Sequence, residues 1–321
     1  MKRVLSFFFQ PSIRALLALL LLGGIILLAN PLQSLPLLLE AGPVLLLWLA
    51  VGFGGIILTN ALAVWWVLRT MKNIPLKRVL LNYTYSWSTE FYFPGKLGMF
   101  SLAYFLQKEK VEVGESVASI LLIKMTMLVW LFLLSLLAIG SLLTTNDFLI
   151  YSGTLIAVVG GLSFLFLTER GRHFIRYGVL GKHAVHFIGF SRLVKTMLGD
   201  PMKWIGLFFL VFLSIFINGI MVQGLFAEVG YSLDLLTVLG VVSSTILVGL
   251  IPISLNGLGV KEGALIVFMG LHGIPTEIAA SVGLLSTTTG YVLSLLIMAL
   301  VLKEIPSTIW KGGIPHAGRP A

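Results

Sequence analysis

Long apolar runs separated by short polar segments dominate the chain. Six of these runs approach the roughly 20 residues that a helix needs to cross the hydrocarbon core of a bilayer. They predict full membrane spans at about 13–30, 44–68, 116–141, 148–168, 204–226 and 277–302. The pattern therefore indicates an all-α polytopic membrane protein, a single integral membrane domain over residues 1–321.

Two further apolar stretches, 79–107 and 236–271, are interrupted in the middle. The interruptions read "STEFYFPGKLG" and "IPISLNGLGVKEG", and combine proline, glycine and charge. Proline removes a backbone donor, glycine frees the backbone and a charge is costly to desolvate, so each sequence ends a helix. The residues that we assign to the breaks are Pro94, Gly95, Pro252 and Gly263.

The arms after the breaks, 99–107 and 260–271, are too short to span a bilayer. We therefore expect two re-entrant hairpins, each of which enters and leaves on the same side. Irregular backbone at membrane depth is tolerated only when protein or a wet cavity surrounds it. A pair of full spans in each stretch is the alternative, and it would leave the loops on the same sides.

Charge orients the chain in the membrane. Every lysine and arginine except Lys96, Lys124 and Lys261 lies in, or next to, one set of alternate loops. The positive-inside rule places those loops, and with them both termini, in the cytoplasm of a cell with the protein in its inner (plasma) membrane. The basic loops are 1–12, 69–78, 108–115, 169–203 and 303–321.

An offset of 161 residues brings the two breaks into register. Leu97-Gly98 then aligns with Leu258-Gly259, and Ala103 with Ala264. We expect an internal repeat with copies at about 79–141 and 240–302. Because three full spans separate the hairpins, the copies would be inverted, as in transporters whose paired broken helices form the binding site.

Composition narrows the function classes. The chain is 58% hydrophobic and 11% charged, has a mean hydropathy of +1.02 and contains no cysteine. A soluble domain, disulfides and thiolate chemistry are thereby excluded. There is no P-loop, aspartate-rich metal pair, HExxH or GxSxG motif, so we expect no cofactor, no metal and no nucleic-acid partner. The apolar N-terminus lacks a small-x-small cleavage site, which favours a retained first helix over a signal peptide.

Charges in the breaks suggest an anion site. Lys261 follows a glycine turn at the start of a short helix, and Lys96 precedes the other short arm. A helix N-terminus together with an ammonium group attracts phosphate. If the tips converge, they form an electropositive pocket for a phospholipid or polyprenyl phosphate. The residues that we expect to bind the lipid phosphate are Lys96, Lys261, Gly98, Gly257, Gly259 and Asn256.

Structural roles compete with these assignments. Lys261 and Glu262 could neutralise each other, and Lys96 could anchor at the cytoplasmic surface. Glu90 and Lys124 could form a charge pair. The Glu90 carboxyl group could also cap backbone amides or carry a proton. For Asn256 and Ser254, satisfying unwound backbone is favoured over contact with a ligand. We assign Glu262, Glu90 and Lys124 to coupling or charge pairing.

The segment 169–203 has the composition of a cytoplasmic amphipathic element. His183 and His186 stand three residues apart inside it, which is a helical spacing for a metal. The basic, amphipathic character of 172–198 favours instead a helix on anionic lipid.

The motifs at the breaks resemble those of a known family. "IPISLNGLGVKEGALIVFMGLHGIPTEIAA" resembles the C-terminal signature of the lysylphosphatidylglycerol synthase transmembrane-region family, also called flippase-like domain proteins. "YFPGKLGMFSLAYFLQKEKVEVGESVAS" resembles its first signature, and the resemblance covers about residues 10–305. Lys261 stands where arginine is usual, Asn256 where glycine is usual and Met99 where glutamate is common.

The resemblance implies a role with lipids. The family includes the membrane half of multiple peptide resistance factors, which move aminoacylated phosphatidylglycerol between leaflets. Our hypothesis is a lipid translocase for an anionic phospholipid or a polyprenyl-phosphate-linked lipid, rather than an enzyme. A membrane-embedded transferase that uses a lipid-phosphate donor, and a non-catalytic partner of a separate synthase or glycosyltransferase, stay open as alternatives. The sequence does not indicate the oligomeric state.

Overall fold

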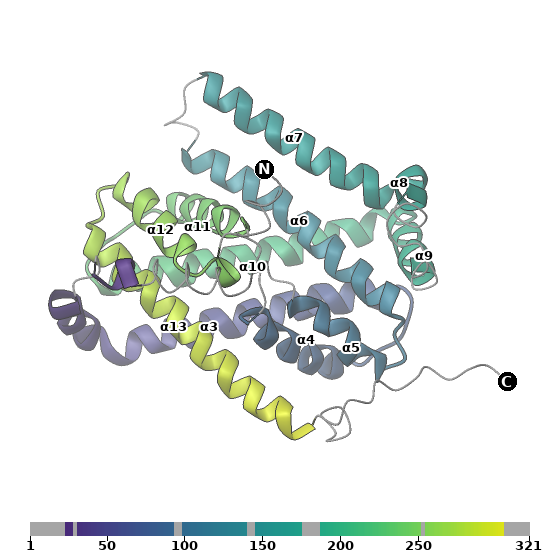
Figure 1. The fold of residues 1–321 in the computed structure, drawn as a ribbon, viewed down its shortest axis with the longest axis horizontal. Coiled ribbons are helices and arrows are strands. Elements are labelled where there is room, and N and C mark those ends of the chain that lie inside the picture. The colour runs from purple at the N-terminus through teal and green to yellow at the C-terminus, as the bar shows by residue number, and fades with distance from the viewer. Residues whose placement is uncertain are drawn as a thin grey trace, which may run out of the picture.

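The computed structural model describes residues 23–27, 31–92, 98–139, 145–174, 187–251 and 254–304. These residues form helices and short connections, with no strand among them (Figure 1). The helices are α3 (Pro31–Leu68), α4 (Leu76–Glu90), α5 (Ser101–Gln107), α6 (Val113–Ile139), α7 (Thr145–Leu167), α8 (Glu169–Phe174), α9 (Phe187–Leu198), α10 (Pro201–Glu228), α11 (Leu235–Gly249), α12 (Val260–Gly270) and α13 (Thr276–Glu304).

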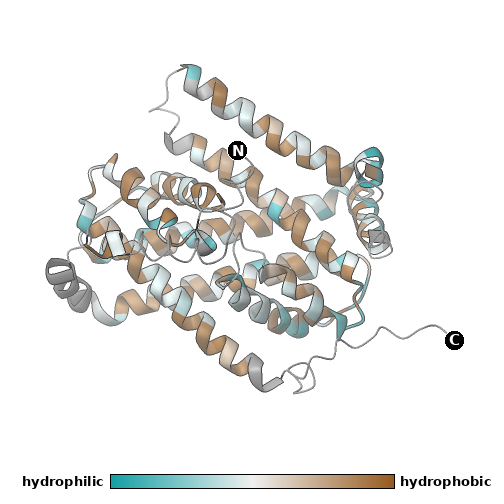
Figure 2. Cartoon of the chain, viewed as in Figure 1, coloured by the Kyte–Doolittle hydropathy of each residue, from teal (hydrophilic) through white to brown (hydrophobic). Residues whose placement is uncertain are grey.

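Within the described residues, four helical segments are long and apolar enough to cross a membrane: Gly42–Leu68, Val113–Leu136, Pro201–Glu228 and Thr276–Leu300. Apolar residues cover most of these helices along their length (Figure 2). These four segments agree with a polytopic, all-α membrane protein. The predicted span 148–168 falls in α7, whose apolar part is shorter, and the predicted span 13–30 lies outside the described residues except for a helical piece at 23–27.

Helix α3 is longer than the sequence predicts. It begins at Pro31 rather than near residue 44, and Gly42 breaks its regular geometry with φ 39°. Only a residue without a side chain adopts that conformation cheaply, so the helix kinks there. The spanning part of α3 starts at this kink.

Helices α3 and α10 pack against each other along most of their length. A small residue on one helix faces a large one on the other, which lets the backbones approach closely. Early positions of α3 meet late positions of α10 and the reverse, so the two helices run antiparallel. The facing pairs are Gly52 with Met221, Gly55 with Ile217, Trp48 with Gly224 and Trp66 with Gly206, and Asn60 donates to Ser214.

The first interrupted stretch folds back on itself. The Tyr85 ring on α4 lies 5.7 Å from the Phe105 ring on α5, edge to face. Arg78, near the start of α4, forms an ion pair of 3.0 Å with Glu109, just after α5. The chain therefore leaves and returns at the same end of the molecule (Figure 1).

The second interrupted stretch is built in the same way. Helix α11 ends at Gly249, α12 begins at Val260, and the two helices pack together. Val238 near the start of α11 and Met269 near the end of α12 are buried in one apolar cluster. Both interruptions thus divide an apolar stretch into two helices, at the positions that proline, glycine and charge indicate.

The basic loops that the sequence groups on one face contact one another. Lys72 pairs with Glu115 at 3.2 Å, and Arg192 pairs with Glu112 at 3.4 Å. The first pair joins the end of α3 to the start of α6, and the second joins α9 to the residue just before α6. Away from these loops, the Trp48 indole N–H of α3 donates a hydrogen bond to the Glu228 carboxylate at the end of α10.

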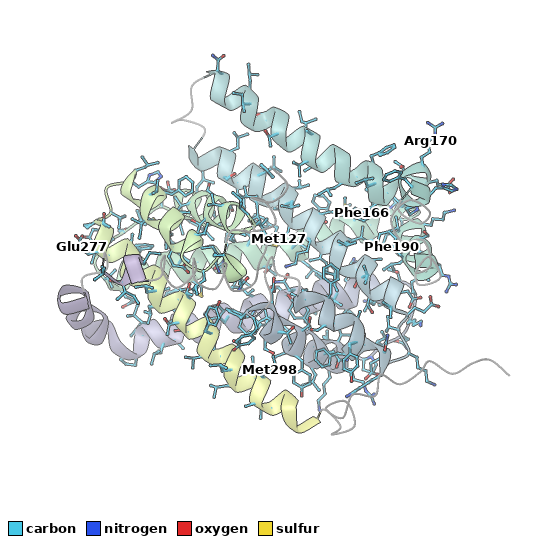
Figure 3. The ribbon with its side chains drawn as sticks, in the orientation of Figure 1. Met127, Phe166, Arg170, Phe190, Glu277 and Met298 are labelled. Atoms are coloured by element: carbon cyan, nitrogen blue, oxygen red, sulfur yellow. The ribbon has the colours of Figure 1, made fainter. Side chains whose placement is uncertain are left out.

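The segment 169–203 forms two short helices where it is described. Helix α9 buries one apolar face, with Phe190, Leu193, Val194 and Met197 in the core. Phe190 points towards Phe166 of α7, with the ring centroids 5.8 Å apart (Figure 3). The segment is therefore docked on the bundle through that face. His183 and His186 lie outside the described residues.

Helix positions agree with the 161-residue offset. The starts of α4 and α11 differ by 159 residues (235 minus 76), those of α5 and α12 by 159 (260 minus 101), and those of α6 and α13 by 163 (276 minus 113). Contacts also correspond when the halves are exchanged, because α6 packs on α11 while α13 packs on α4. These relations support the inverted repeat, which we retain as an inference.

Candidate functional site

A cavity of about 240 Å³ lies between the two interruptions. Trp87 and Phe91, at the end of α4, form one part of its wall. Lys261 and Glu262, at the start of α12, form another, and α3, α10, α11 and α13 supply the rest. The volume is below the roughly 300–1,000 Å³ of a typical small-molecule site. It suits a headgroup rather than a whole lipid.

Left-handed backbone shapes the second interruption. Asn256, Gly257 and Gly259 have φ of 50°, 72° and 81°. Glycine reaches this region without strain, whereas asparagine is one of the few other residues that tolerates it. The resulting turn reverses the chain between α11 and α12 and leads directly to Lys261.

Glycines also make room for the Lys261 side chain. A methyl group added to Gly249 would overlap the aliphatic stem of Lys261, and one added to Gly257 would lie 2.8 Å from the Gly249 carbonyl oxygen. The lysine stem therefore crosses a surface of bare backbone. Bulkier residues at either position would move the ammonium group out of its place in the cavity wall.

Glu262 caps helix α12. Its carboxylate accepts a hydrogen bond of 2.7 Å from the Gly259 backbone N–H and a second one from the Thr287 hydroxyl of α13. A carboxylate in the first helical turn also interacts favourably with the helix dipole. Glu262 is 2% exposed and does not pair with Lys261. The neutralisation of Lys261 by Glu262, one of the structural alternatives, is thus not what the geometry shows.

Lys261 contributes the positive charge of the cavity. Among the residues that the structure describes, none forms an ion pair or a hydrogen bond with its ammonium group. A buried or half-buried ammonium without a partner is costly in an apolar protein. An anion that enters the cavity would supply that partner.

Aromatic rings close one side of the cavity. Phe53, Trp87, Phe91 and Tyr291 form a chain of edge-to-face contacts, with centroid distances of 5.9, 4.9 and 5.1 Å. Such contacts stabilise by about 0.5–1.5 kcal/mol each beyond burial of the ring surface. They connect the end of α4 with α3 and α13, and so hold the first interruption against the second half.

Several buried polar atoms near the second interruption lack a hydrogen-bond partner. The side-chain oxygens of Ser254, Asn256 and Thr245 are among them, and Asn256 is 5% exposed. The expectation that Asn256 and Ser254 satisfy unwound backbone is therefore not met by these oxygen atoms. Thr245 lines the cavity, but its hydroxyl oxygen is buried rather than exposed at the cavity surface.

The first interruption is held by hydroxyl groups. Thr89 donates to the Gly98 carbonyl at 2.7 Å, and Ser86 donates to the Met99 carbonyl at 2.8 Å. Gly98 is packed so closely on the Thr89 backbone that a side chain would overlap it. Gly98 thus allows the two backbone segments to approach each other closely, and it is not part of the cavity wall.

Glu90 and Lys124 form an ion pair of 3.2 Å between the end of α4 and α6. Glu90 is 6% exposed, and Lys124 lies outside the wall of the first cavity. Of the residues assigned to the site from sequence, the structure brings Lys261, Glu262 and the end of α4 together. It places Glu90 and Lys124 next to them as a separate pair. Gly263 lies in α12 with open space around it.

Four of the assigned positions, Lys96, Pro94, Gly95 and Pro252, lie outside the described residues.

The sequence did not indicate most of the residues that line the cavity. Thr287 and Thr245 are isolated hydroxyls in apolar helices, which give no pattern to distinguish them. The aromatic residues Trp87 and Phe91 did carry a signal, because they stand four apart immediately before a helix break.

The comparisons with known proteins agree with the motifs at the interruptions. The chain matches the family described as "Lysylphosphatidylglycerol synthase TM region" over residues 15–297. A comparison with curated proteins and one with solved structures find no match. The family match includes both interruptions and every helix that lines the cavity. The chain therefore belongs to the lysylphosphatidylglycerol synthase TM region family.

Proposed function

We propose that the protein is a lipid translocase that binds a lipid phosphate in the cavity between the two interruptions. The observation that carries this proposal is the half-buried ammonium of Lys261, which faces a cavity and has no ionic partner among the described residues. A phosphate group would neutralise it. Membership of a family of lipid-related membrane proteins supports the same substrate class.

The candidate substrates are an anionic phospholipid and a polyprenyl-phosphate-linked lipid. Both carry a phosphate at one end and hydrocarbon at the other. The cavity volume of about 240 Å³ accepts a headgroup and leaves the chains to apolar surroundings. A separately encoded synthase or glycosyltransferase would supply the lipid if it is modified before transport.

Alternating access follows from the proposed inverted repeat. The end of α4 and the start of α12 come from different halves and share one cavity. Rocking of one half against the other would open this cavity first to one leaflet and then to the other. Both termini and the ion-paired basic loops would lie on the cytoplasmic side of the inner membrane.

Transport assays in proteoliposomes test the proposal. Full-length wild type is expected to move a fluorescent phosphatidylglycerol between leaflets, and Lys261→Ala to abolish most of that movement. Lys195→Ala is the matched control, because it removes a lysine from α9, outside the cavity, whose exposed ammonium pairs with Glu169. If wild type moves neither phosphatidylglycerol nor a polyprenyl phosphate above empty vesicles, the translocase proposal is wrong.

The same preparation separates the alternatives. If the protein is a transferase, purified wild type would release product from a lipid-phosphate donor without moving lipid. Lys261→Ala would stop that turnover. A non-catalytic partner would show neither activity and would co-purify with a second protein regardless of Lys261.

A further inference from the structure

A second cavity lies on the other side of the first interruption. It has a volume of about 210 Å³ and is lined by eight apolar residues and one lysine, Lys124. Met99 and Phe100 come from the interruption itself, Leu250 comes from the residue after α11, and the rest of the lining belongs to α6. Met127, one of these α6 residues, lies in the middle of the bundle (Figure 3).

The lining follows one face of α6. Ile120, Lys124, Met127 and Leu131 are spaced by three or four residues, so their side chains point the same way. Among the described residues that line the cavity, Lys124 is the only charged one, and its ammonium is paired with Glu90 at 3.2 Å. The cavity therefore presents a charge-balanced group at one edge and hydrocarbon elsewhere.

Its chemistry selects an apolar occupant. A cavity lined by aliphatic and aromatic side chains does not hold water, because a water molecule needs two to four polar partners. Apolar cavities of about 150 Å³ take up molecules of the size of benzene, and this one is larger. Several methylene groups of a hydrocarbon chain would fit.

The two cavities are neighbours in the fold. On α11, Ile246 lines the first cavity and Leu250, one turn later, lines the second; the Leu250 N–H donates to the Ile246 carbonyl. At the end of α4, Phe91 lines the first cavity while the adjacent Glu90 binds the lysine of the second. The ends of α4 and α11 therefore border both cavities, the first with Lys261 and Glu262 in its wall and the second largely apolar.

We infer that the second cavity holds a segment of a hydrocarbon chain of the transported lipid while the phosphate occupies the first. This inference rests on the proposed translocase function. The Glu90–Lys124 pair lies at the polar edge of the chain site. The chain would travel within the protein rather than stay in the surrounding bilayer.

Photo-crosslinking tests the chain site without a transport assay. Full-length protein is reconstituted in phosphatidylcholine vesicles that contain phosphatidylglycerol with a diazirine in the middle of one acyl chain. Adducts are expected on the α6 peptide at residues 120–131 in wild type. Leu128→Trp fills the cavity and should lower their yield several-fold, whereas Leu133→Trp, at an exposed position on the same helix, should not. Equal adduct yields in Leu128→Trp and wild type, or adducts confined to exposed residues, would overturn the inference.

A second filling variant covers the case in which Leu128→Trp does not fold. Met127→Phe adds less volume to the same cavity and should lower the adduct yield in the same direction.

Chain length provides the functional arm. The filled variant is expected to lose transport of a long-chain phosphatidylglycerol and to retain transport of a short-chain analogue with the same headgroup, while Lys261→Ala loses both. Cavity adducts with no transport of any lipid by wild type would refute the translocase function and leave the chain site standing. Normal transport with no cavity adducts would refute the chain site alone.

Discussion

The carboxylate of Glu262 occupies the first turn of α12 with both of its oxygens engaged, one by the Gly259 N–H and one by the Thr287 hydroxyl. A buried hydrogen bond to a charged group contributes about 1.5–3 kcal/mol. The bond from Gly259 caps α12, and the bond from Thr287 connects α12 to α13. The residue therefore stabilises the turn that presents Lys261, whatever further part it has in transport.

Substitutions at Glu262 should separate capping from charge. Glu262→Ala removes both acceptors, and we expect it to lower the free energy of unfolding by about 3 kcal/mol. Glu262→Gln keeps one carbonyl acceptor and should cost less than half of that. Thermal unfolding in detergent measures both. A glutamine variant as unstable as the alanine variant would contradict the capping role, and normal stability with a changed pH dependence of transport would add a coupling role.

The pair between Glu90 and Lys124 makes a different residue-scale prediction. Lys124→Met leaves the Glu90 carboxylate buried without this partner, and we expect a loss of about 2 kcal/mol. This is below the 3–5 kcal/mol of fully buried pairs, because the Lys124 side chain is 30% exposed. The double variant Glu90→Gln/Lys124→Met should recover much of the loss. A double-mutant cycle by chemical unfolding tests this, and additive losses would show that the two charges do not interact.

At the scale of elements, the glycines of the two interruptions fall into two kinds. Gly98 lies against the backbone of Thr89, and a methyl group there would overlap it. Gly263 has open space around it and lies within α12. From sequence, Gly98 was assigned to the lipid-phosphate site and Gly263 to the break, yet it is Gly98 that close packing requires.

Alanine substitutions at the two glycines should therefore change the stability of the protein in opposite directions. Gly98→Ala forces backbone against backbone and is expected to destabilise by about 3 kcal/mol or to prevent folding. Gly263→Ala removes glycine from a helix and should stabilise by about 0.5–1 kcal/mol. Expression yield and the thermal unfolding midpoint compare the two variants. A Gly98→Ala protein as stable as wild type would contradict the close approach of the first short arm to α4.

Most element positions could be predicted from sequence because they follow from composition over many residues. Among the described residues, the apolar runs gave the positions of α6, α7, α10 and α13 to within a few residues but missed the start of α3, and proline, glycine and charge located both interruptions. The hydrogen bond from Thr287 to Glu262 could not be predicted, since it joins residues 25 apart on two helices, α12 and α13. The aromatic chain from Phe53 to Tyr291 likewise depends on how the halves meet.

At the scale of the whole molecule, the antiparallel pairing of α3 and α10 explains how the halves relate. These helices hold corresponding positions in the proposed repeat, since they end at residues 68 and 228, an offset of 160 (228 minus 68). Two equivalent helices that run in opposite directions imply a two-fold axis across the bundle. Such an axis would carry α6 and α11 onto α13 and α4, which is the exchange that the contacts follow. The cavity then lies where broken elements of both halves approach this axis.

Rocking about that axis predicts which contacts must change during transport. Tyr92 at the first interruption bonds Ser294 of α13, with 2.9 Å between their hydroxyl oxygens, and this contact joins the two halves beside the cavity. The pair Asn60 and Ser214 instead lies within the central crossing of α3 and α10.

The chain has no native cysteine, so paired cysteines can be introduced without background. We expect Tyr92→Cys/Ser294→Cys to lose lipid movement after treatment with a short bifunctional thiol reagent and to regain it when a cleavable reagent is reduced. Asn60→Cys/Ser214→Cys, linked in the same way, should retain most movement, because residues near a rotation axis are displaced least. Equal transport by the two linked variants would contradict a mechanism in which the halves separate beside the cavity, and arrest of both would place the moving surface at the central crossing.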